Sequence, residues 1–190
     1  MLALQDSVAA GMTRTVVVYE LLSLDGVADD PNSFIDDWDD EMDARLGEVI
    51  ATQDAVILGR SSYDDWSEYW PGKDIQPFSD FINPVAKFVA TSTPLEREWT
   101  NATVIDGDPV EFVRRLKGGD GGEIGIHASI SLARALLAAG VVDELKLVIA
   151  PKIAGSGRRL LGGVPPITLE PIRSSVSSGG HLLVDYRIVR

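Results

Sequence analysis

The sequence contains no cysteine, and this absence excludes several kinds of site at once. Without thiols the chain cannot form a disulfide framework, a thiolate metal centre or a cysteine nucleophile. Its two histidines, His127 and His181, lie far apart in the sequence, so a histidine-rich metal site is not expected either. We therefore predict no metal site, and the lack of cysteine agrees with a cytoplasmic protein.

Long apolar runs and clusters of positive charge are also missing. The aliphatic residues form short stretches such as 16–18, 55–58 and 145–149, far from the roughly 20 residues that cross a membrane, so no membrane partner is expected. The chain has 17 Lys and Arg against 29 Asp and Glu, and its formal net charge of −12 would repel nucleic acid. A phosphorylated ligand could bind only where backbone NH groups and a few arginines reverse the local field.

The length of 190 residues fits one domain. The first residues contain Asp6 and no basic stretch ahead of an apolar one, so they do not resemble a secretory signal. We expect a flexible leader over residues 1–12 and a single domain over residues 13–190.

Aliphatic and β-branched segments alternate with amphipathic ones along the chain, which favours an α/β fold. The pattern predicts strands at 15–22, 55–58, 87–90, 102–105, 123–127 and 145–150. It predicts helices at 39–52, from 61 onward, at 78–83, at 108–117 and at 129–139. Segments 167–175 and 182–189, around the turn residues 177–180, indicate a C-terminal hairpin. We predict a mostly parallel central sheet with an antiparallel C-terminal hairpin, although the short link before 145–150 leaves that strand's direction open.

One candidate anion site follows the strand at 55–58. Gly59 and Arg60 come after the strand, and Ser61 and Ser62 then open a helix. A helix N-terminus offers unpaired NH groups and a partial positive charge, and an arginine adds a planar cation suited to phosphate. Taken alone, an ordinary capped helix with a solvated Arg60 remains the simpler interpretation.

A second candidate follows the strand at 123–127. His127 is followed by Ala128, Ser129 and Ile130, and the small residues would let a phosphate approach the backbone at the helix start, where Ser129 could act as the cap. The glycine fingerprint of dinucleotide-binding βαβ units is absent. The plainer interpretation of His127 is a strand-end histidine bonded to a backbone carbonyl.

Hydroxyl and carboxyl groups supply two further candidates. Thr91, Ser92 and Thr93 follow the strand at 87–90, where turn chemistry explains them as well as phosphate contact does. Asp25 and the acidic stretch 36–43 are by default a turn residue and a solvated helix face. A carboxylate held in an apolar pocket could instead bind an aminopyrimidine or pterin-like ring, or relay a proton to it.

In this order and spacing, these segments resemble the dihydrofolate-reductase-like family, in the branch that contains the reductase domain of the bifunctional riboflavin enzyme. The resemblance rests on Ser23-Leu24-Asp25-Gly26, on residues 56–60, on Thr91-Ser92-Thr93 and on residues 136–145. It implies a three-layer dihydrofolate-reductase-like fold, a homodimer, and an NADPH-dependent reductase that transfers hydride to a small heterocycle, a carbonyl or an imine. One departure is that His127-Ala128 stands where relatives commonly have two glycines, often at a cis peptide.

The resemblance also assigns roles to residues. The resemblance makes Asp25 the catalytic candidate, and it implies that the adenosine end of NADPH lies near Arg60 and the segment Thr91-Ser92-Thr93. The cofactor-binding residues that it implies are Gly59, Arg60, Ser61, Ser62, Thr91, Ser92, Thr93, His127, Ala128, Ser129 and Ile130. The alternative is a non-catalytic nucleotide- or dinucleotide-binding dimeric protein, and the sequence also leaves a flavin- or deazaflavin-using reductase open.

Overall fold

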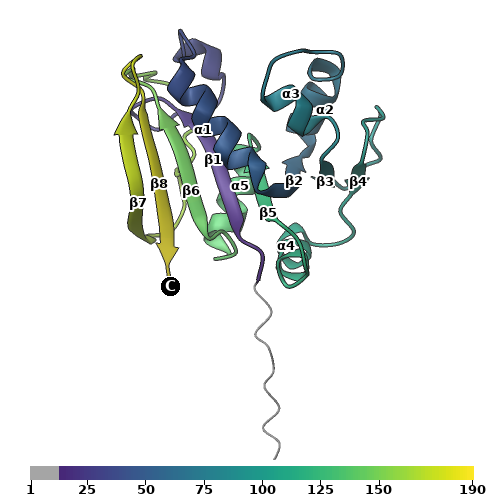
Figure 1. Ribbon diagram of the computed structural model, residues 1–190. Coiled ribbons are helices and arrows are strands. Elements are labelled where there is room, and N and C mark those ends of the chain that lie inside the picture. The colour runs from purple at the N-terminus through teal and green to yellow at the C-terminus, as the bar shows by residue number, and fades with distance from the viewer. Residues whose placement is uncertain (1–12) are drawn as a thin grey trace, which may run out of the picture.

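The computed structural model describes residues 13–190, and the expected leader, residues 1–12, lies outside them. Within the described residues, eight strands form one sheet in the order β4-β3-β2-β5-β1-β6-β8-β7 (Figure 1). In chain order they are β1 (Val16–Leu22), β2 (Gln53–Gly59), β3 (Ala86–Ala90), β4 (Ala102–Val104), β5 (Glu123–His127), β6 (Glu144–Ile149), β7 (Thr168–Val176) and β8 (Leu182–Val189). Strands β1 to β6 run parallel, and β8 pairs antiparallel with both β6 and β7. The predicted mostly parallel sheet with a C-terminal antiparallel hairpin is confirmed.

Helices cover both faces of this sheet. They are α1 (Asp40–Ala51), α2 (Arg60–Tyr69), α3 (Phe78–Ile82), α4 (Pro109–Lys117) and α5 (Ile130–Ala138). Helices α1, α2 and α3 pack on one face, where their apolar side chains form a core with the sheet, and α4 and α5 pack on the other. Figure 1 shows α1 crossing in front of the sheet with α5 behind it. This is the three-layer arrangement that the sequence predicts.

Local sequence explains how α1 forms and where it packs. Asp39 caps the helix by accepting a hydrogen bond from the backbone N–H of Met42 at 2.9 Å. Met42, Leu46 and Val49 recur at three- and four-residue intervals and are buried against the sheet. Three acidic residues in the first turn complement the helix dipole.

The direction of β6, which the sequence left open, is parallel to β1. The pairing runs from Val17 with Glu144 to Leu22 with Ile149. Strands β5 and β6 and helix α5 thus form a βαβ unit with β1 lying between the two strands. Pro31–Ser33 also form a short 3-10 helix, which the sequence pattern did not indicate. No helix within residues 13–190 is both long and apolar enough to cross a membrane.

Candidate cofactor and substrate site

The carboxyl ends of β2 and β5 form a topological switch point. Strand β2 leads through α2 toward β3, whereas β5 leads through α5 toward β6, on the other side of the sheet and along its other face. Neighbouring strands whose chains leave in opposite directions open a crevice, and α/β proteins bind ligands there. We use the name crevice for this part of the sheet edge, between the carboxyl ends of β2 and β5. The two predicted helix starts meet there, because the backbone N–H of Gly59 donates to Ser129 Oγ at 2.9 Å.

The helices that begin at the crevice have no side-chain caps. Asp39 and Asp108 cap α1 and α4, but neither α2 nor α5 has a side-chain hydrogen bond at its N-cap. Ser129 is the N-cap residue of α5, yet its hydroxyl accepts from Gly59 instead of capping the helix, contrary to the prediction. Uncapped first-turn N–H groups are the partners that a phosphate uses.

The side chain of Arg60, which follows β2, reaches the segment that follows β3. It is hydrogen-bonded to the protein, so the simpler interpretation of a solvated Arg60 is wrong. Its Nη1 donates to Thr93 Oγ1 at 2.6 Å and to the carbonyl of Pro94 at 2.8 Å, so the segment 91–93 does lie beside the first helix start. Its Nε donates to both carboxylate oxygens of Asp64, at 2.7 and 2.8 Å. Asp64 therefore competes with any phosphate that approaches Arg60.

The two threonines among the predicted hydroxyl groups are hydrogen-bonded within the described part of the chain, whereas the three serines at the α2 start and after β3 are not. Thr91 Oγ1 accepts a hydrogen bond from the backbone N–H of Thr93 at 3.2 Å. Within residues 13–190, the side chains of Ser61, Ser62 and Ser92 make no hydrogen bond to the protein, and Ser61 and Ser92 are exposed. These hydroxyl groups are available to a ligand, but their contact with NADPH stays a prediction.

The backbone at Ala128 and Ser129 is left-handed, with φ angles of 52° and 61°. Only glycine adopts this region freely, and other residues held there usually cost about 1–3 kcal/mol each. The chain thus adopts a conformation that glycines favour without having them, and the peptide bonds at this turn are trans. Strained backbone that is held by its surroundings clusters at ligand sites, which agrees with the predicted position of Ala128 and Ile130 beside a phosphate.

His127 turns toward the face covered by α1 and α3. Its Nε2 lies 2.7 Å from Gln53 Oε1, so the expected backbone-carbonyl partner is wrong. With the Gln53 amide in this orientation its oxygen accepts, which assigns the proton to Nε2 and leaves Nδ1 as a buried acceptor without a partner within residues 13–190. Burial lowers the pKa of His127 to about 3, so the ring stays neutral. The side chain of His127 packs beside Phe78 and Phe81 of α3, away from α5.

Asp25 is occupied as a clamp for a neighbouring loop. Its carboxylate accepts hydrogen bonds from Ser23 Oγ at 2.7 Å and from the backbone N–H groups of Ala154 and Gly155 at 2.9 and 3.0 Å. The hydrogen bond from Ser23 and those from the loop lower the pKa of Asp25 to about 2. An ionised, fully bonded carboxylate is a poor proton donor, so this geometry favours a structural role over the predicted catalytic one.

Strands β1 and β5 separate beside the crevice, at a point that we call the fork. Their last pair is Tyr19 with His127, while β1 continues along β6 to Leu22. Tyr19 Oη and Glu20 Oε1 are both buried there without hydrogen-bond partners. Burial raises the pKa of Tyr19, and it raises that of Glu20 to about 8. Sequence reasoning missed both residues, although a glutamate inside the buried run Val16–Leu22 was an available signal.

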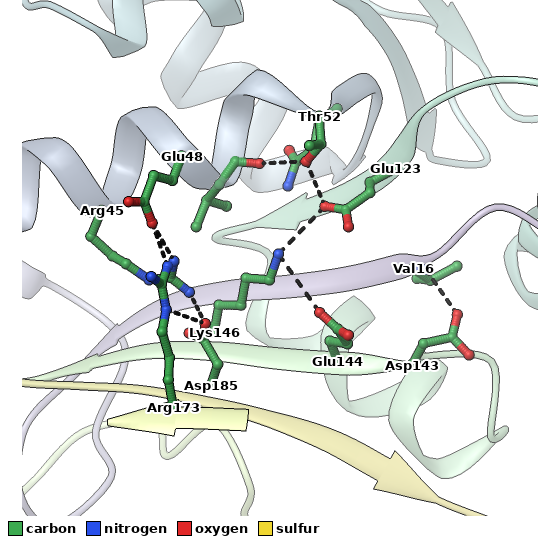
Figure 2. A network of polar contacts seen from close by, with 12 residues as sticks. Val16, Arg45, Glu48, Thr52, Glu123, Asp143, Glu144, Lys146, Arg173 and Asp185 are labelled. Atoms are coloured by element: carbon green, nitrogen blue, oxygen red, sulfur yellow. Dashed lines mark hydrogen bonds and ion pairs between the residues drawn. The ribbon is translucent and has the colours of Figure 1, made fainter. Parts of the chain in front are cut away.

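Charged residues also gather under α1, at the amino ends of β5 and β6 (Figure 2). Arg45 and Arg173 both pair with Asp185 and Glu48, and Lys146 lies 3.5 Å from Glu123. They line a cavity of about 390 Å³. A second cavity of about 610 Å³ lies beside the β3–β4 connection, lined by Tyr63, Leu95, Arg97, Glu98, Trp99, Thr100 and Ala102. Neither cavity is lined by the helix starts at the crevice, and the carboxylates in the network are already paired.

Solved structures of other proteins share the fold of this chain. Among the solved structures, a candidate riboflavin biosynthesis protein from Shewanella sp. PV-4 has a similar fold, with a TM-score of 0.74, 19% identity, and coverage of 93% of this chain and 99% of that one. Dihydrofolate reductase from Enterococcus faecalis, complexed with NADP(H), has a TM-score of 0.60 and 14% identity, with coverage of 93% and 97%. These likenesses show that the fold is dihydrofolate-reductase-like.

Sequence comparison gives the family. An uncharacterized protein of Bacillus subtilis (strain 168), YyaP, is 26% identical over 179 residues, which are 91% of this chain and 94% of the relative. The RibD C-terminal domain family matches residues 14–183, nearly the whole of the described chain. With the sheet order, the crevice and this match together, the chain belongs to the RibD C-terminal domain family.

Proposed function

We propose that this protein is an NADPH-dependent reductase that acts on a small heterocycle, a carbonyl or an imine. The observation that carries the proposal is the meeting of two uncapped helix N-termini at the switch point, on a chain whose net charge otherwise repels anions. Membership of the RibD C-terminal domain family and a fold shared with a dihydrofolate reductase complexed with NADP(H) support it.

The residues at the crevice fit a dinucleotide in a definite direction. The N–H groups at the starts of α2 and α5 would hold its phosphates, and Arg60 with the 91–93 segment would hold its adenosine end. Since the sheet order is β3-β2-β5-β1, the nicotinamide end would then lie toward β1 and the fork. NADPH, when bound, supplies the hydride.

The protein's own part is to orient the substrate against the fork. Tyr19 and His127 present a hydroxyl and an imidazole Nδ1 on the face covered by α1, and both side chains are neutral around pH 7. Neutral hydrogen-bonding groups in an apolar wall can position a planar ring without attracting water. We therefore expect the substrate to bind on the α1 side of the sheet.

A titration with NADPH, followed by nicotinamide fluorescence, tests the proposal. We expect saturable binding, which Arg60→Ala weakens and Ala128→Leu abolishes because the larger side chain fills the phosphate approach. Glu68→Gln, near the C-terminal end of α2 and away from the helix start, is the matched control and should bind like the wild type. An Ala128→Leu protein that folds and binds NADPH with unchanged affinity would show that the phosphates lie elsewhere.

The second candidate is a dinucleotide-binding protein without turnover. The engagement of Asp25 by Ser23 and the loop favours it, because the predicted catalytic group has no proton to give. The two functions separate when the protein is mixed with NADPH and a panel of pyrimidines, pterins and carbonyl compounds. Loss of absorbance of the reduced cofactor supports the reductase, and binding without oxidation across the panel supports the alternative.

We further propose that a second copy of the chain covers the C-terminal strands. Strand β7 is at the edge of the sheet and is almost wholly exposed, and Ile172, Val176 and Leu182 are exposed apolar residues beside that edge. Sedimentation equilibrium tests this directly. We expect a dimer that Val176→Lys shifts toward monomer, and a wild-type chain that is monomeric at all concentrations would refute it.

A further inference from the structure

Glu20 occupies the fork without any partner in the described part of the chain. It is the first residue of β1 beyond the last β1–β5 pair, which places it level with Ala128, where the chain turns into α5. The residue is 5% exposed, and its Oε1 has no hydrogen-bond partner. A buried carboxyl that makes no bond costs stability, so its position calls for an explanation.

The side chain of Glu20 faces the α5 side of the sheet. Side chains alternate along a strand, and the neighbouring residues of the same parity, Val18 and Leu22, belong to the core beneath α5. Tyr19 belongs to the opposite core, under α1. The carboxyl therefore lies on the face from which α5 begins, next to the left-handed turn.

The core beneath α5, on the face of the sheet that Glu20 occupies, is built from buried apolar side chains. The core under α5 contains residues of β1, β5, β6, β8, α5 and the loops that cover the sheet, namely Val18, Leu22, Ala28, Ile126, Ile130, Ala133, Leu147, Leu160 and Val184. No charged group among residues 13–190 contributes to the pKa of Glu20, which burial alone raises to about 8. The nearest titratable neighbour in the chain, Tyr19, points to the other face. Glu20 is thus a neutral carboxyl around pH 7.

We propose that the Glu20 carboxyl binds the carboxamide of the nicotinamide ring through a pair of hydrogen bonds. This inference rests on the proposed function, which directs the nicotinamide end of the dinucleotide to the fork. A protonated carboxyl donates through its hydroxyl and accepts through its carbonyl, and a primary carboxamide offers the matching acceptor and donor. The pair satisfies the buried carboxyl and fixes the orientation of the ring, which no backbone contact to phosphate can do.

The proposal predicts that nicotinamide binding depends on the protonation of one group. Wild-type affinity for NADPH should be constant up to about pH 8 and then fall by up to about tenfold per pH unit as Glu20 ionises. Binding of 2′,5′-ADP, which carries the adenosine phosphates but no nicotinamide, should not change over the same range. Both ligands are titrated by calorimetry from about pH 7.5 to about pH 9.5, where phosphate ionisation is complete.

Three variants sharpen the test. Glu20→Gln keeps a donor and an acceptor but cannot ionise, so NADPH affinity should stay within a few-fold of wild type near pH 7.5 and lose its pH dependence. Glu20→Leu should weaken NADPH by roughly tenfold to a hundredfold, the effect of two lost hydrogen bonds, and leave 2′,5′-ADP unchanged. Glu68→Gln, near the C-terminal end of α2, removes an exposed carboxylate that pairs with Arg97 and should match the wild type in every measurement.

The possible failures are distinguishable. If both ligands bind and neither Glu20 variant changes the ratio of their affinities, Glu20 does not touch the nicotinamide and the inference falls while the cofactor site stands. If Glu20→Leu weakens both ligands equally, the residue acts only through the fold and the inference falls again. If the wild type binds neither ligand, the proposed function and the inference fail together.

Discussion

Replacing Glu20 by glutamine should change how the stability of the protein depends on pH, whatever the protein binds. Burial raises the pKa of Glu20 from its ordinary value of 4.5 to about 8 in the folded state. Between those values the folded protein holds one proton more than the unfolded chain, so the stability that this carboxyl contributes is full below about pH 4.5 and is lost as the pH rises toward 8. The loss is about 1.4 kcal/mol per pH unit and about 5 kcal/mol over the whole interval.

Glutamine has nearly the same shape and does not titrate, so the variant escapes this loss. The difference in free energy of unfolding, Glu20→Gln minus wild type, should increase with pH by about 3 kcal/mol between about pH 5.5 and about pH 7.5. Above about pH 8 it should stay constant. Urea unfolding followed by the fluorescence of the four tryptophans measures it at each pH.

The test rests on how the difference in free energy of unfolding changes with pH and not on its absolute value. The other titratable groups are the same in both proteins, so their contributions cancel in the difference. Glu68→Gln is the matched control, since it also removes one carboxylate but from an exposed pair with Arg97, and its difference from wild type should not change with pH. Parallel stability curves for Glu20→Gln and wild type would refute the reasoning, because they would mean that Glu20 ionises as easily in the folded protein as in the unfolded chain.

Three other substitutions test the rest of the geometry. Gly125→Ala would drive a methyl group into the Gln53 amide, so we expect a loss of about 2–4 kcal/mol, measured by thermal unfolding. Asp25→Asn removes the charged acceptor of two backbone N–H groups, so trypsin should cut the loop at residues 154–155 faster in the variant, and equal cleavage of both proteins at pH 7 would contradict this. In the wild type the contribution of the ionised carboxylate is present above the ordinary aspartate pKa of 3.8 and is lost as the pH falls toward 2. Asp64→Asn frees Arg60 from its carboxylate partner, so calorimetry should show 2′,5′-ADP binding several-fold tighter than to wild type.

The sheet could be predicted because each strand is marked by its own local pattern. Buried strands such as β1 and β2 are aliphatic runs that end at turn residues, and α1 shows an apolar residue at every helical turn. The direction of β6 could not be read from the same pattern. It depends on whether α5 carries the chain back over β1, which is a packing result in three dimensions.

Only one part of the candidate site could be predicted from the sequence, namely the two helix starts that directly follow strands. The helix starts at Gly59 and Ser129 follow strands directly, so their place at one sheet edge follows from topology. The partner of His127 comes from Gln53, which is 74 residues distant, and the role of Asp25 depends on a loop near residue 154. Such long-range contacts leave no trace in local spacing. Glu20 did leave a signal, because it is an acidic residue inside the buried run of β1.

The neutrality of Glu20 also removes an electrostatic obstacle to the proposed function. The chain carries a net charge of −12, and Arg60, at the start of α2, is already held by Asp64. A dinucleotide diphosphate must therefore rely on the backbone N–H groups at the starts of α2 and α5, whose attraction is modest. An ionised carboxylate beside the α5 start would oppose that attraction, whereas a desolvated, protonated one does not. The same burial that lowers the stability of the protein above pH 5 thus keeps the crevice acceptable to an anion, and the stability and binding experiments on Glu20 should report one common pKa in the unliganded protein.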